Sequence, residues 1–218
     1  MPIASPAQLA RSSFTREVML GVLDAVHGDV IDFGAGMSRY KKWIMQKAKT
    51  YTAMDIHDFP GIDIVGDVLK PPLADASYDT VLSTHVIEHV REPWVMVEQI
   101  ARVLRPGGTV ILMAPFMYPF HADPYDFFRF SEQGLRSLFE RAGLQVELCS
   151  KYGGWLDIWS ETIKQSFLSP YRKPHPWWKR RVFSVIETVF GFINRRMRPG
   201  IAYTNVVIVA HKVPAPRP

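Results

Sequence analysis

Cysteine is almost absent from this sequence, and so is any long uninterrupted apolar run. Cys149 is the only cysteine, so an internal disulfide and cysteine-based zinc sites are excluded. The longest uncharged stretch, residues 106–122, is broken by prolines and glycines, which excludes a membrane-spanning helix there. The first thirty residues hold no continuous apolar segment. We therefore expect no secretory signal and a cytoplasmic location.

The composition is that of a globular protein. The chain has 218 residues, of which 47% are hydrophobic and 22% charged, and this predicts a single domain over residues 1–218. The net charge of +5 is unevenly distributed: residues 1–150 carry −4, with 14 basic and 18 acidic side chains, whereas residues 151–218 carry +9, with 12 and 3. The basic charge therefore belongs to the last third of the chain.

Short apolar segments alternate with amphipathic ones. The pattern predicts strands at 29–33, 51–54, 62–65, 78–83, 109–113, 144–148 and 204–210, and helices at 13–26, 39–49, 86–104 and 132–142. Alternating strands and helices with short links indicate an α/β fold, in which a mostly parallel sheet is covered by helices on both faces. Residues 213–218 are expected to form a loose tail.

Glycines and acidic residues follow the first two predicted strands. Gly34 and Gly36 end the strand at 29–33, and Asp55 follows the next strand, 19 positions after Gly36. Ligands of open α/β sheets bind beyond the carboxyl ends of the strands, and an acid about 20 residues after the glycine turn accepts hydrogen bonds from ribose. These positions predict a nucleoside-bearing cofactor. Arg39 stands where the third glycine of G-x-G-x-x-G would be, which argues against a nicotinamide.

The order of the motifs resembles the class I S-adenosylmethionine-dependent methyltransferases of the type 11 group. The matching segments are Val30–Gly36, Asp55, Gly66–Val68, Ser77–Val81, Val86–Val90 and Arg102–Gly108. The resemblance implies a Rossmann-like, seven-stranded, mostly parallel sheet whose last strand is antiparallel. It also implies S-adenosylmethionine as cofactor and in-line transfer of its methyl group to a small-molecule or glycan acceptor. The basic last third of the chain would suit a lipid-linked acceptor.

Roles for individual residues follow from the same resemblance. Gly34 and Gly36 would pass beneath the methionine part of the cofactor, and Asp32 would order the loop around its amino group. Asp55 would hold the ribose. The remaining positions implied to bind the cofactor are Asp67 at the adenine amino group, Val68 against the adenine ring, and Thr84 or His85 closing the site.

The acceptor is expected near the end of the fifth strand. Residues 114–131 resemble a subgroup of these methyltransferases associated with cell-surface glycan synthesis. His121 is a candidate general base, because the ordinary pKa of histidine lies near neutrality, and Asp126 a candidate to orient it. Tyr125 and Arg129 are expected to bind substrate, since a guanidinium fork grips carboxylates and phosphates. In the alternative, His121, Asp126 and Arg129 only hold the loop together.

A second enzyme class competes at residues 85–89. His85, Glu88 and His89 match the H-x-x-E-H pattern of metalloproteases, although the pattern is short and lies within a segment that the methyltransferase resemblance already accounts for. Some methyltransferases of quinone precursors have acidic and histidine metal ligands in this helix, so a divalent ion stays open. We expect no metal here.

Residues 151–200 form a basic, aromatic insertion between the sixth and seventh strands. One predicted helix face carries apolar residues, and basic residues flank it; the apolar ones are Phe183, Ile186, Phe190, Ile193 and Met197, and the basic ones Lys179, Arg180, Arg181, Arg195, Arg196 and Arg198. The mixture suits an anionic membrane surface. In one alternative the apolar face packs on the sheet or in a homodimer. A nucleic-acid partner ranks third, because no nucleic-acid-binding module accompanies the charge. The whole chain could also be a non-catalytic binding protein with the same fold.

Overall fold

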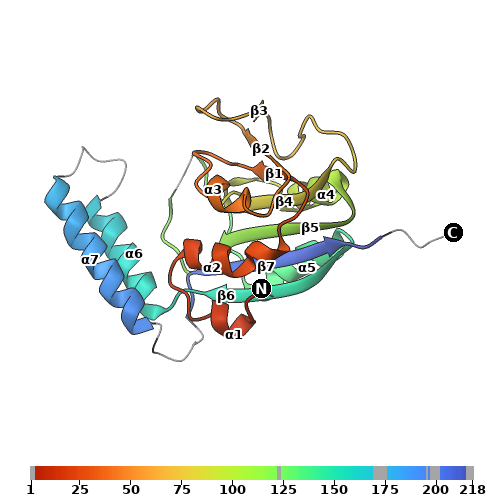
Figure 1. The fold of residues 1–218 in the computed structure, drawn as a ribbon. Coiled ribbons are helices and arrows are strands. Elements are labelled where there is room, and N and C mark those ends of the chain that lie inside the picture. Colours follow the sequence, from red (N-terminus) through yellow and green to blue (C-terminus); the bar gives the residue numbers. More distant parts are fainter. Residues whose placement is uncertain (1–2, 122–123, 169–175, 195, 197–201, 215–218) are drawn as a thin grey trace.

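The computed structural model describes residues 3–121, 124–168, 176–194, 196 and 202–214. Its centre is one seven-stranded sheet, built from β1 (Asp29–Phe33), β2 (Thr50–Asp55), β3 (Ile64–Val65), β4 (Tyr78–Thr84), β5 (Leu104–Pro115), β6 (Leu144–Tyr152) and β7 (Asn205–Lys212). The strand order is β3-β2-β1-β4-β5-β7-β6 (Figure 1), and β7 runs antiparallel to the other six strands. The predicted mostly parallel sheet with an antiparallel last strand is confirmed.

Helices cover both faces of the sheet, as predicted. One core layer joins the sheet to α1 (Pro6–Leu9), α2 (Thr15–Val22), the 3-10 turn η1 (Leu23–Ala25) and α3 (Lys41–Ile44). The other joins it to α4 (Pro93–Val103) and α5 (Glu132–Arg141). Successive residues of β1 point to opposite layers, Val30 to the first and Ile31 to the second. Both are fully buried, which is why β1 has an almost unbroken apolar sequence.

The predicted helix over residues 86–104 is wrong in its first part. Residues 87–89 form a 3-10 turn, η2 (Ile87–His89), Val90 is extended, and α4 starts only at Pro93. The ring of Pro93 disfavours helical backbone in the residue before it while suiting the first turn of a helix. Several other bounds differ. The helix predicted at 13–26 divides into α2 and η1, and the one predicted at 39–49 shortens to α3. The strand predicted at 62–65 shortens to β3, whereas β5 starts earlier, at Leu104, and β6 extends to Tyr152.

The insertion forms a helical hairpin of α6 (Trp155–Leu168) and α7 (Trp177–Asn194), which projects from one end of the sheet (Figure 1). Phe183 of α7 stacks on Phe167 of α6, with ring centroids 6.4 Å apart. The predicted apolar face of α7 is therefore turned partly toward α6: Phe183, Ile186 and Phe190 are half-buried, whereas Ile193 is exposed. Arg195, Met197, Arg198, the side chain of Arg180 and the end of the predicted loose tail lie outside the described residues.

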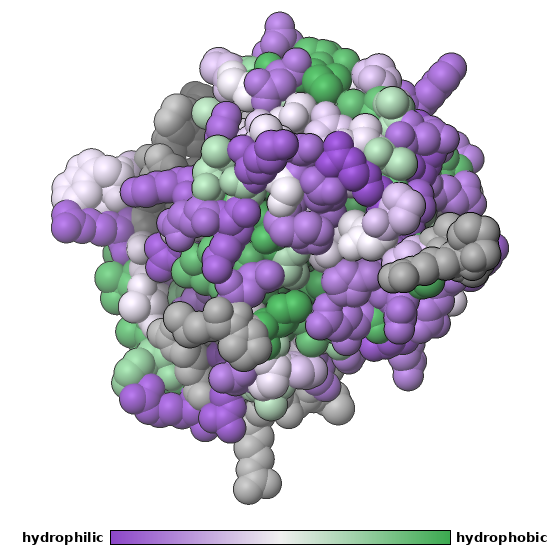
Figure 2. Space-filling view, turned by 45° about the vertical axis from the view of Figure 1, so that its right-hand side comes forward, coloured by the Kyte–Doolittle hydropathy of each residue, from purple (hydrophilic) through white to green (hydrophobic). Residues whose placement is uncertain are grey.

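A second apolar stripe of α7 faces solvent. Val182, Val185, Val189 and Phe192 are 50%, 60%, 47% and 51% exposed, and their spacing puts them on one side of the helix. None of the described helices is long and apolar enough to cross a membrane. Unlike this stripe, the face of the molecule in Figure 2 has mainly hydrophilic side chains, and its hydrophobic ones form separate patches.

Candidate active site

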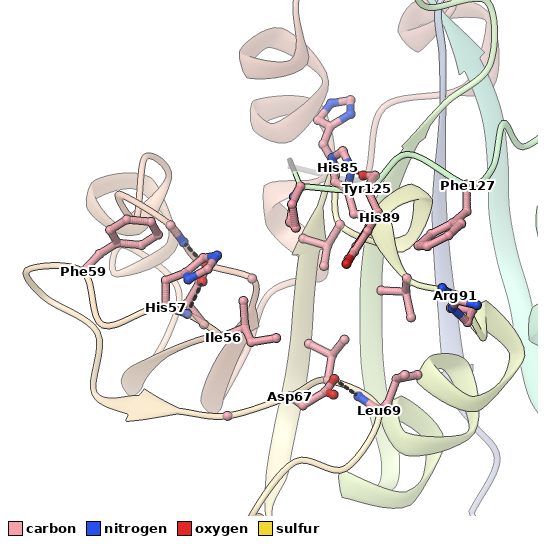
Figure 3. A pocket seen from close by; sticks show the side chains of 18 residues that line it. Ile56, His57, Phe59, Asp67, Leu69, His85, His89, Arg91, Tyr125 and Phe127 are labelled. Carbon is pink, nitrogen blue, oxygen red and sulfur yellow. Dashed lines mark hydrogen bonds between the residues drawn. The ribbon is translucent and has the colours of Figure 1, made fainter. Parts of the chain in front are cut away.

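A cavity of about 480 Å³ opens at the carboxyl ends of β1, β2 and β4. Ile56, His57 and Phe59 lie on one side of it, Arg91 and Phe127 on the opposite side (Figure 3). The strand order reverses direction between β1 and β4, and open α/β sheets bind their ligands at such a reversal. The cavity lies at this position. We call it the cofactor cavity.

The glycine turn after β1 forms the floor of this cavity. Gly34 and Gly36 both have left-handed backbone, with φ of +69° and +50°. A Cβ on Gly34 would lie 2.3 Å from Cγ2 of Val86, whereas one on Gly36 would have no atom within 4 Å. Gly34 therefore allows close packing inside the protein, and Gly36 leaves open space on the cavity side. Such a cradle fits a ligand that approaches the backbone.

Asp55 anchors the glycine turn. Its Oδ2 accepts a hydrogen bond from the backbone N–H of Gly36 (2.9 Å), and its Oδ1 accepts one from that of His57 (2.9 Å). Each carboxylate oxygen has a further lone pair, which leaves acceptors for the hydroxyls of a ribose. The side chain is mostly buried and lines the cofactor cavity, where the sequence placed it.

Asp67 and Val68 lie in the same cavity wall. Asp67 is exposed, and its Oδ1 accepts a hydrogen bond from the backbone N–H of Leu69 (2.8 Å), as Figure 3 shows. Val68 is buried beside it and presents an apolar surface. An acceptor next to an apolar side chain fits the edge and face of a purine. The donor set therefore fits a nucleoside cofactor.

Neither Asp32 nor Thr84 lines the cofactor cavity. Asp32 points instead into the layer beneath α3, where the hydroxyl of Tyr51 donates to its Oδ2 (2.6 Å). Burial raises the pKa of Asp32 to about 7, against the hydrogen bond from Tyr51, and the charge of Asp55 adds to the increase. Of Thr84 and His85, only His85 closes the cavity.

His85 lies between the cofactor cavity and a second one of about 490 Å³, and it lines both. Its φ of +56° is unusual for a residue with a side chain, and its backbone N–H donates to the carbonyl of Met113 (2.9 Å). Its Nε2 lies 3.4 Å from the hydroxyl of Thr15. The turn after β4 thus holds one imidazole at the junction of two cavities.

The second cavity has a mixed polar and apolar lining, and the helical hairpin forms one of its walls. Tyr118 donates from its hydroxyl to Glu161 of α6 (2.8 Å), and Lys164 pairs with Glu187 of α7 (2.6 Å). The insertion is therefore tied to the loop that follows β5. We call this space the acceptor cavity.

Two buried polar atoms of the acceptor cavity have no hydrogen-bond partner among the described residues. They are Oγ of Ser160 and Oδ1 of Asn205, and both residues line the cavity. Buried polar groups are usually paired, because an unpaired one costs free energy. Both polar groups are therefore unsatisfied within the described part of the chain. No sequence pattern selects Ser160 and Asn205, which are 45 positions apart.

The loop from β5 to α5 holds His121, Asp126 and Arg129 together. The Asp126 side chain is fully buried; Arg129 grips both of its oxygens, and the backbone N–H of His121 donates to Oδ2 (2.8 Å). Burial opposes ionisation of Asp126, but the hydrogen bonds from Arg129 and from the His121 backbone lower its pKa to about 2.

Arg129 also donates to three carbonyl oxygens of the loop, those of Tyr118, Pro119 and Phe128. With the two bonds to Asp126, all five of its N–H groups have partners within the chain. The geometry thus favours the alternative in which Arg129 holds the loop over the expected grip on a substrate. Tyr125, the other expected substrate-binding residue, is 58% exposed at the rim of the cofactor cavity.

His121 lines the acceptor cavity, and its Nε2 lies 3.8 Å from Oε1 of Glu88. Glu88 and the carbonyl of Pro119 raise the pKa of His121 against its partial burial. Glu88 is fully buried and also faces His85 and His89, at 3.7 and 3.8 Å. The metalloprotease pattern had marked Glu88 and His89, but not His121, which lies 32 positions further along the chain. The backbone over 85–89 is not α-helical, contrary to what that protease pattern needs.

Comparisons with known proteins agree with this architecture. The family model of a methyltransferase domain matches residues 31–112. A probable S-adenosylmethionine-dependent methyltransferase of Mycolicibacterium smegmatis is 30% identical over 135 residues, which cover 55% of this chain and 52% of the relative. The chain thus spans about half the length of that relative, and less of the next ones.

Solved structures share the fold across nearly the whole chain. The [4+2]-cyclase SpnF superposes with a TM-score of 0.63 at 13% identity, covering 94% of this chain and 85% of SpnF. An S-adenosylmethionine-dependent methyltransferase of Mesorhizobium loti gives 0.56 at 14%, covering 88% and 97%. The family match spans β1 to β5, and the cofactor cavity lies at the ends of these strands, so this part of the chain is similar to an S-adenosylmethionine-dependent methyltransferase domain.

Proposed function

We propose that this chain transfers the methyl group of S-adenosylmethionine to a hydroxyl group of a glycan or similar polyhydroxylated acceptor. The observation that carries the proposal is the position of His85, which lines both the cofactor cavity and the acceptor cavity. Two ligands that share one wall can bring their reacting atoms together. When bound, the cofactor supplies a methyl group on a positively charged sulfur, so the protein has mainly to align the acceptor.

The cofactor side of the site follows from the contacts above. Gly34 and Gly36 let the cofactor lie against the backbone, Asp55 accepts hydrogen bonds from its ribose, and Asp67 and Val68 hold its adenine. Each of these residues lines the cofactor cavity. We infer a positioning role for Asp32, through Tyr51 and β2, rather than direct contact.

On the acceptor side, His121 takes the proton of the acceptor hydroxyl at its Nε2. Its raised pKa makes the imidazole a stronger base than an isolated histidine. Asp126 positions it through the backbone hydrogen bond and the bonds to Arg129. We expect His121→Ala to lower turnover much more than cofactor affinity, and unchanged turnover would leave His121 with a loop-holding role only.

The chemistry of the acceptor cavity supports a polyhydroxylated molecule. Ser160 and Asn205 offer unpaired polar atoms, and Glu161, Lys164 and Glu187 add charged groups to the wall. Hydroxyl groups both donate and accept, so a sugar satisfies such a mixed lining better than an apolar or a purely anionic molecule.

The exposed stripe of α7 supports an acceptor carried by a lipid. Apolar side chains on one side of a helix, basic residues nearby and the exposed tryptophans of the hairpin are typical of contact with an anionic membrane surface; these tryptophans are Trp155, Trp159, Trp177 and Trp178. The charge of +9 in residues 151–218 adds electrostatic attraction. We therefore propose that the hairpin rests on the membrane while the adjoining acceptor cavity receives the head group.

Calorimetric titration with S-adenosylmethionine, and separately with NAD, tests the cofactor. We expect binding of the first alone. Transfer of labelled methyl to lipid-linked and free glycans then tests the reaction, with His27→Ala, at an exposed histidine far from the site, as the control for His121→Ala. Cofactor binding without transfer to any acceptor would favour a non-catalytic role. The fold alone does not decide this, since a cyclase shares it.

Flotation with vesicles tests the membrane surface. We expect binding to anionic vesicles that weakens as salt is added, and loss of binding in Val185→Asp. Leu20→Asp, at a similarly exposed apolar residue of α2, is the matched control. Absence of binding at low salt would refute the proposal, and a dimer that Val185→Asp dissociates would assign the stripe to a second copy of the chain.

A further inference from the structure

The buried carboxylate of Glu88 lacks the partners that such a group needs. Its side chain is 0% exposed, and neither oxygen has a hydrogen-bond partner among the described residues. The three nearest imidazole nitrogens, on His85, His89 and His121, lie 3.7 to 3.8 Å from Oε1, beyond hydrogen-bond distance. A buried charge without close partners is costly, so the arrangement calls for a further group.

The hydrogen bonds of two histidines define which nitrogens face Glu88. Nδ1 of His89 lies 2.6 Å from the carbonyl oxygen of Tyr125, and Nδ1 of His121 lies 3.1 Å from that of Pro119. A carbonyl oxygen only accepts, so each Nδ1 donates its proton there. In the neutral imidazoles, each Nε2 then presents a lone pair to the carboxylate. Two imidazole lone pairs that face a carboxylate repel it, and a bound cation would turn this repulsion into attraction.

We propose that Glu88, His89 and His121 bind a divalent transition-metal ion, with zinc as the reference ion. The candidate ligand atoms all lie within 4.8 Å of one another. Two metal–ligand bonds of about 2.1 Å span at most about 4.2 Å, so the 3.8 Å from the Glu88 oxygen to each Nε2 suits a shared ion. Two imidazoles and one carboxylate favour zinc or its first-row neighbours over magnesium.

The outer contacts have the form that metal sites use. Both histidines donate their other N–H to a backbone carbonyl, which fixes the ring orientation and the tautomer. The backbone N–H of Phe127 donates to the carbonyl of Glu88 (2.8 Å) and so ties the loop that carries His121 to η2. The ligands are therefore placed by two separate segments that are bonded to each other.

The position of this site suggests its use, and this step rests on the proposed function. His89 lines the cofactor cavity and His121 the acceptor cavity, so the ion would lie between them. Three protein ligands leave a coordination position open, and an acceptor hydroxyl bound there would have a lowered pKa. With Nε2 of His121 bound to the ion, the acceptor hydroxyl would release its proton to water, so this step keeps from the proposed function the two cavities and the methyl donor and replaces His121 as the base.

Metal content and affinity test the site without any methyl transfer. Untagged protein is stripped with a chelator and titrated calorimetrically with Zn²⁺, and Co²⁺ gives a visible spectrum that reports the ligands. We expect one ion per chain and at least about 10-fold weaker binding in Glu88→Gln, His89→Gln and His121→Gln. His27→Gln, the same change at an exposed histidine outside the site, keeps the affinity of the unaltered protein.

Binding of much less than one ion per chain would overturn the proposal. So would an affinity that the three variants leave unchanged. Circular dichroism identifies a variant that fails to fold. If Glu88→Gln fails to fold, the two histidine variants still decide the test. Because titration with S-adenosylmethionine is a separate measurement, a chain that binds the cofactor but no metal refutes this site alone. One that binds zinc but no cofactor refutes only the proposed function.

Discussion

Replacing Asp32 by asparagine should make the free energy of unfolding less dependent on pH. Asp32 is 3% exposed, and its Oδ1 has no hydrogen-bond partner among the described residues. The titratable groups that face it are Tyr51, which donates to Oδ2, and Tyr40 and Asp55, which interact with its charge. Burial therefore raises its pKa from the ordinary 3.8 to about 7.

The sign follows from where the proton binds. Between the two pKa values the folded protein holds a proton on Asp32 that the unfolded chain has released, so the free energy of unfolding falls as pH rises through this window. Each pH unit in this window lowers the free energy of unfolding by about 1.4 kcal/mol. From about pH 5 to about pH 8 the decrease reaches roughly 2.5 kcal/mol, because it levels off above the pKa of the folded protein. Asp32→Asn has no such term. Relative to the unaltered protein, the variant should gain that amount of stability over the same interval.

Urea unfolding at the two pH values measures the difference directly. Comparing the variant with the unaltered protein at each pH cancels the contributions of other carboxylates. Asp58→Asn, at an exposed aspartate, is the matched control and should show no such gain. Tyr51→Phe removes the donor that favours the ionised form and should move the transition to higher pH. A stability difference between Asp32→Asn and the unaltered protein that is equal at both pH values would show that Asp32 is ionised throughout, and the reasoning from burial would be refuted.

Three further changes test other parts of the site. Gly34→Ala should destabilise the protein by at least about 2 kcal/mol, because the left-handed backbone and the clash with Val86 both oppose a side chain. Gly36→Ala should cost only about 1 kcal/mol, because the left-handed backbone alone opposes it. Equal losses of stability in urea unfolding would contradict the different surroundings of the two glycines. Arg129→Ala should lower the free energy of unfolding by about 3 kcal/mol, because it removes the cation that pairs with the buried Asp126 side chain. A change confined to the KM of an acceptor would instead make Arg129 a substrate-binding residue. Cys149 should react with iodoacetamide only as fast as the chain opens, because burial raises the pKa of its thiol to about 12; rapid modification of the folded protein, followed by mass spectrometry, would contradict this.

The cofactor half of the site could be predicted from the sequence because its signals are local. The strand, the glycine turn and the acid of the next strand lie within residues 29–55, and each has a backbone reason for its residue type. Gly34, Gly36, Asp55, Asp67, Val68 and His85 all line the cofactor cavity. Asp32 was grouped with them because it lies in the same motif. The alternation of a strand turns its side chain away from the cavity, toward Tyr51.

The acceptor half required the tertiary structure. Its wall combines residues near 13–15, 118–121, 157–164 and 205, and only the packing of the hairpin against the sheet brings these together. Periodicity also could not choose between the two apolar stripes of α7, since both fit a helix. The stacking of Phe183 on Phe167 turns one stripe inward and leaves Val182, Val185 and Val189 exposed.

The sequence by itself thus determined the order of strands and helices, the class of fold and the cofactor end, since propensity, apolar period and turn chemistry act over a few neighbouring residues. The meeting of Glu88 with His121 and the joining of two cavities at His85 were decided by the tertiary structure alone. Side chains from distant segments converge only when a buried core fixes the loops that carry them, and no local pattern records that distance.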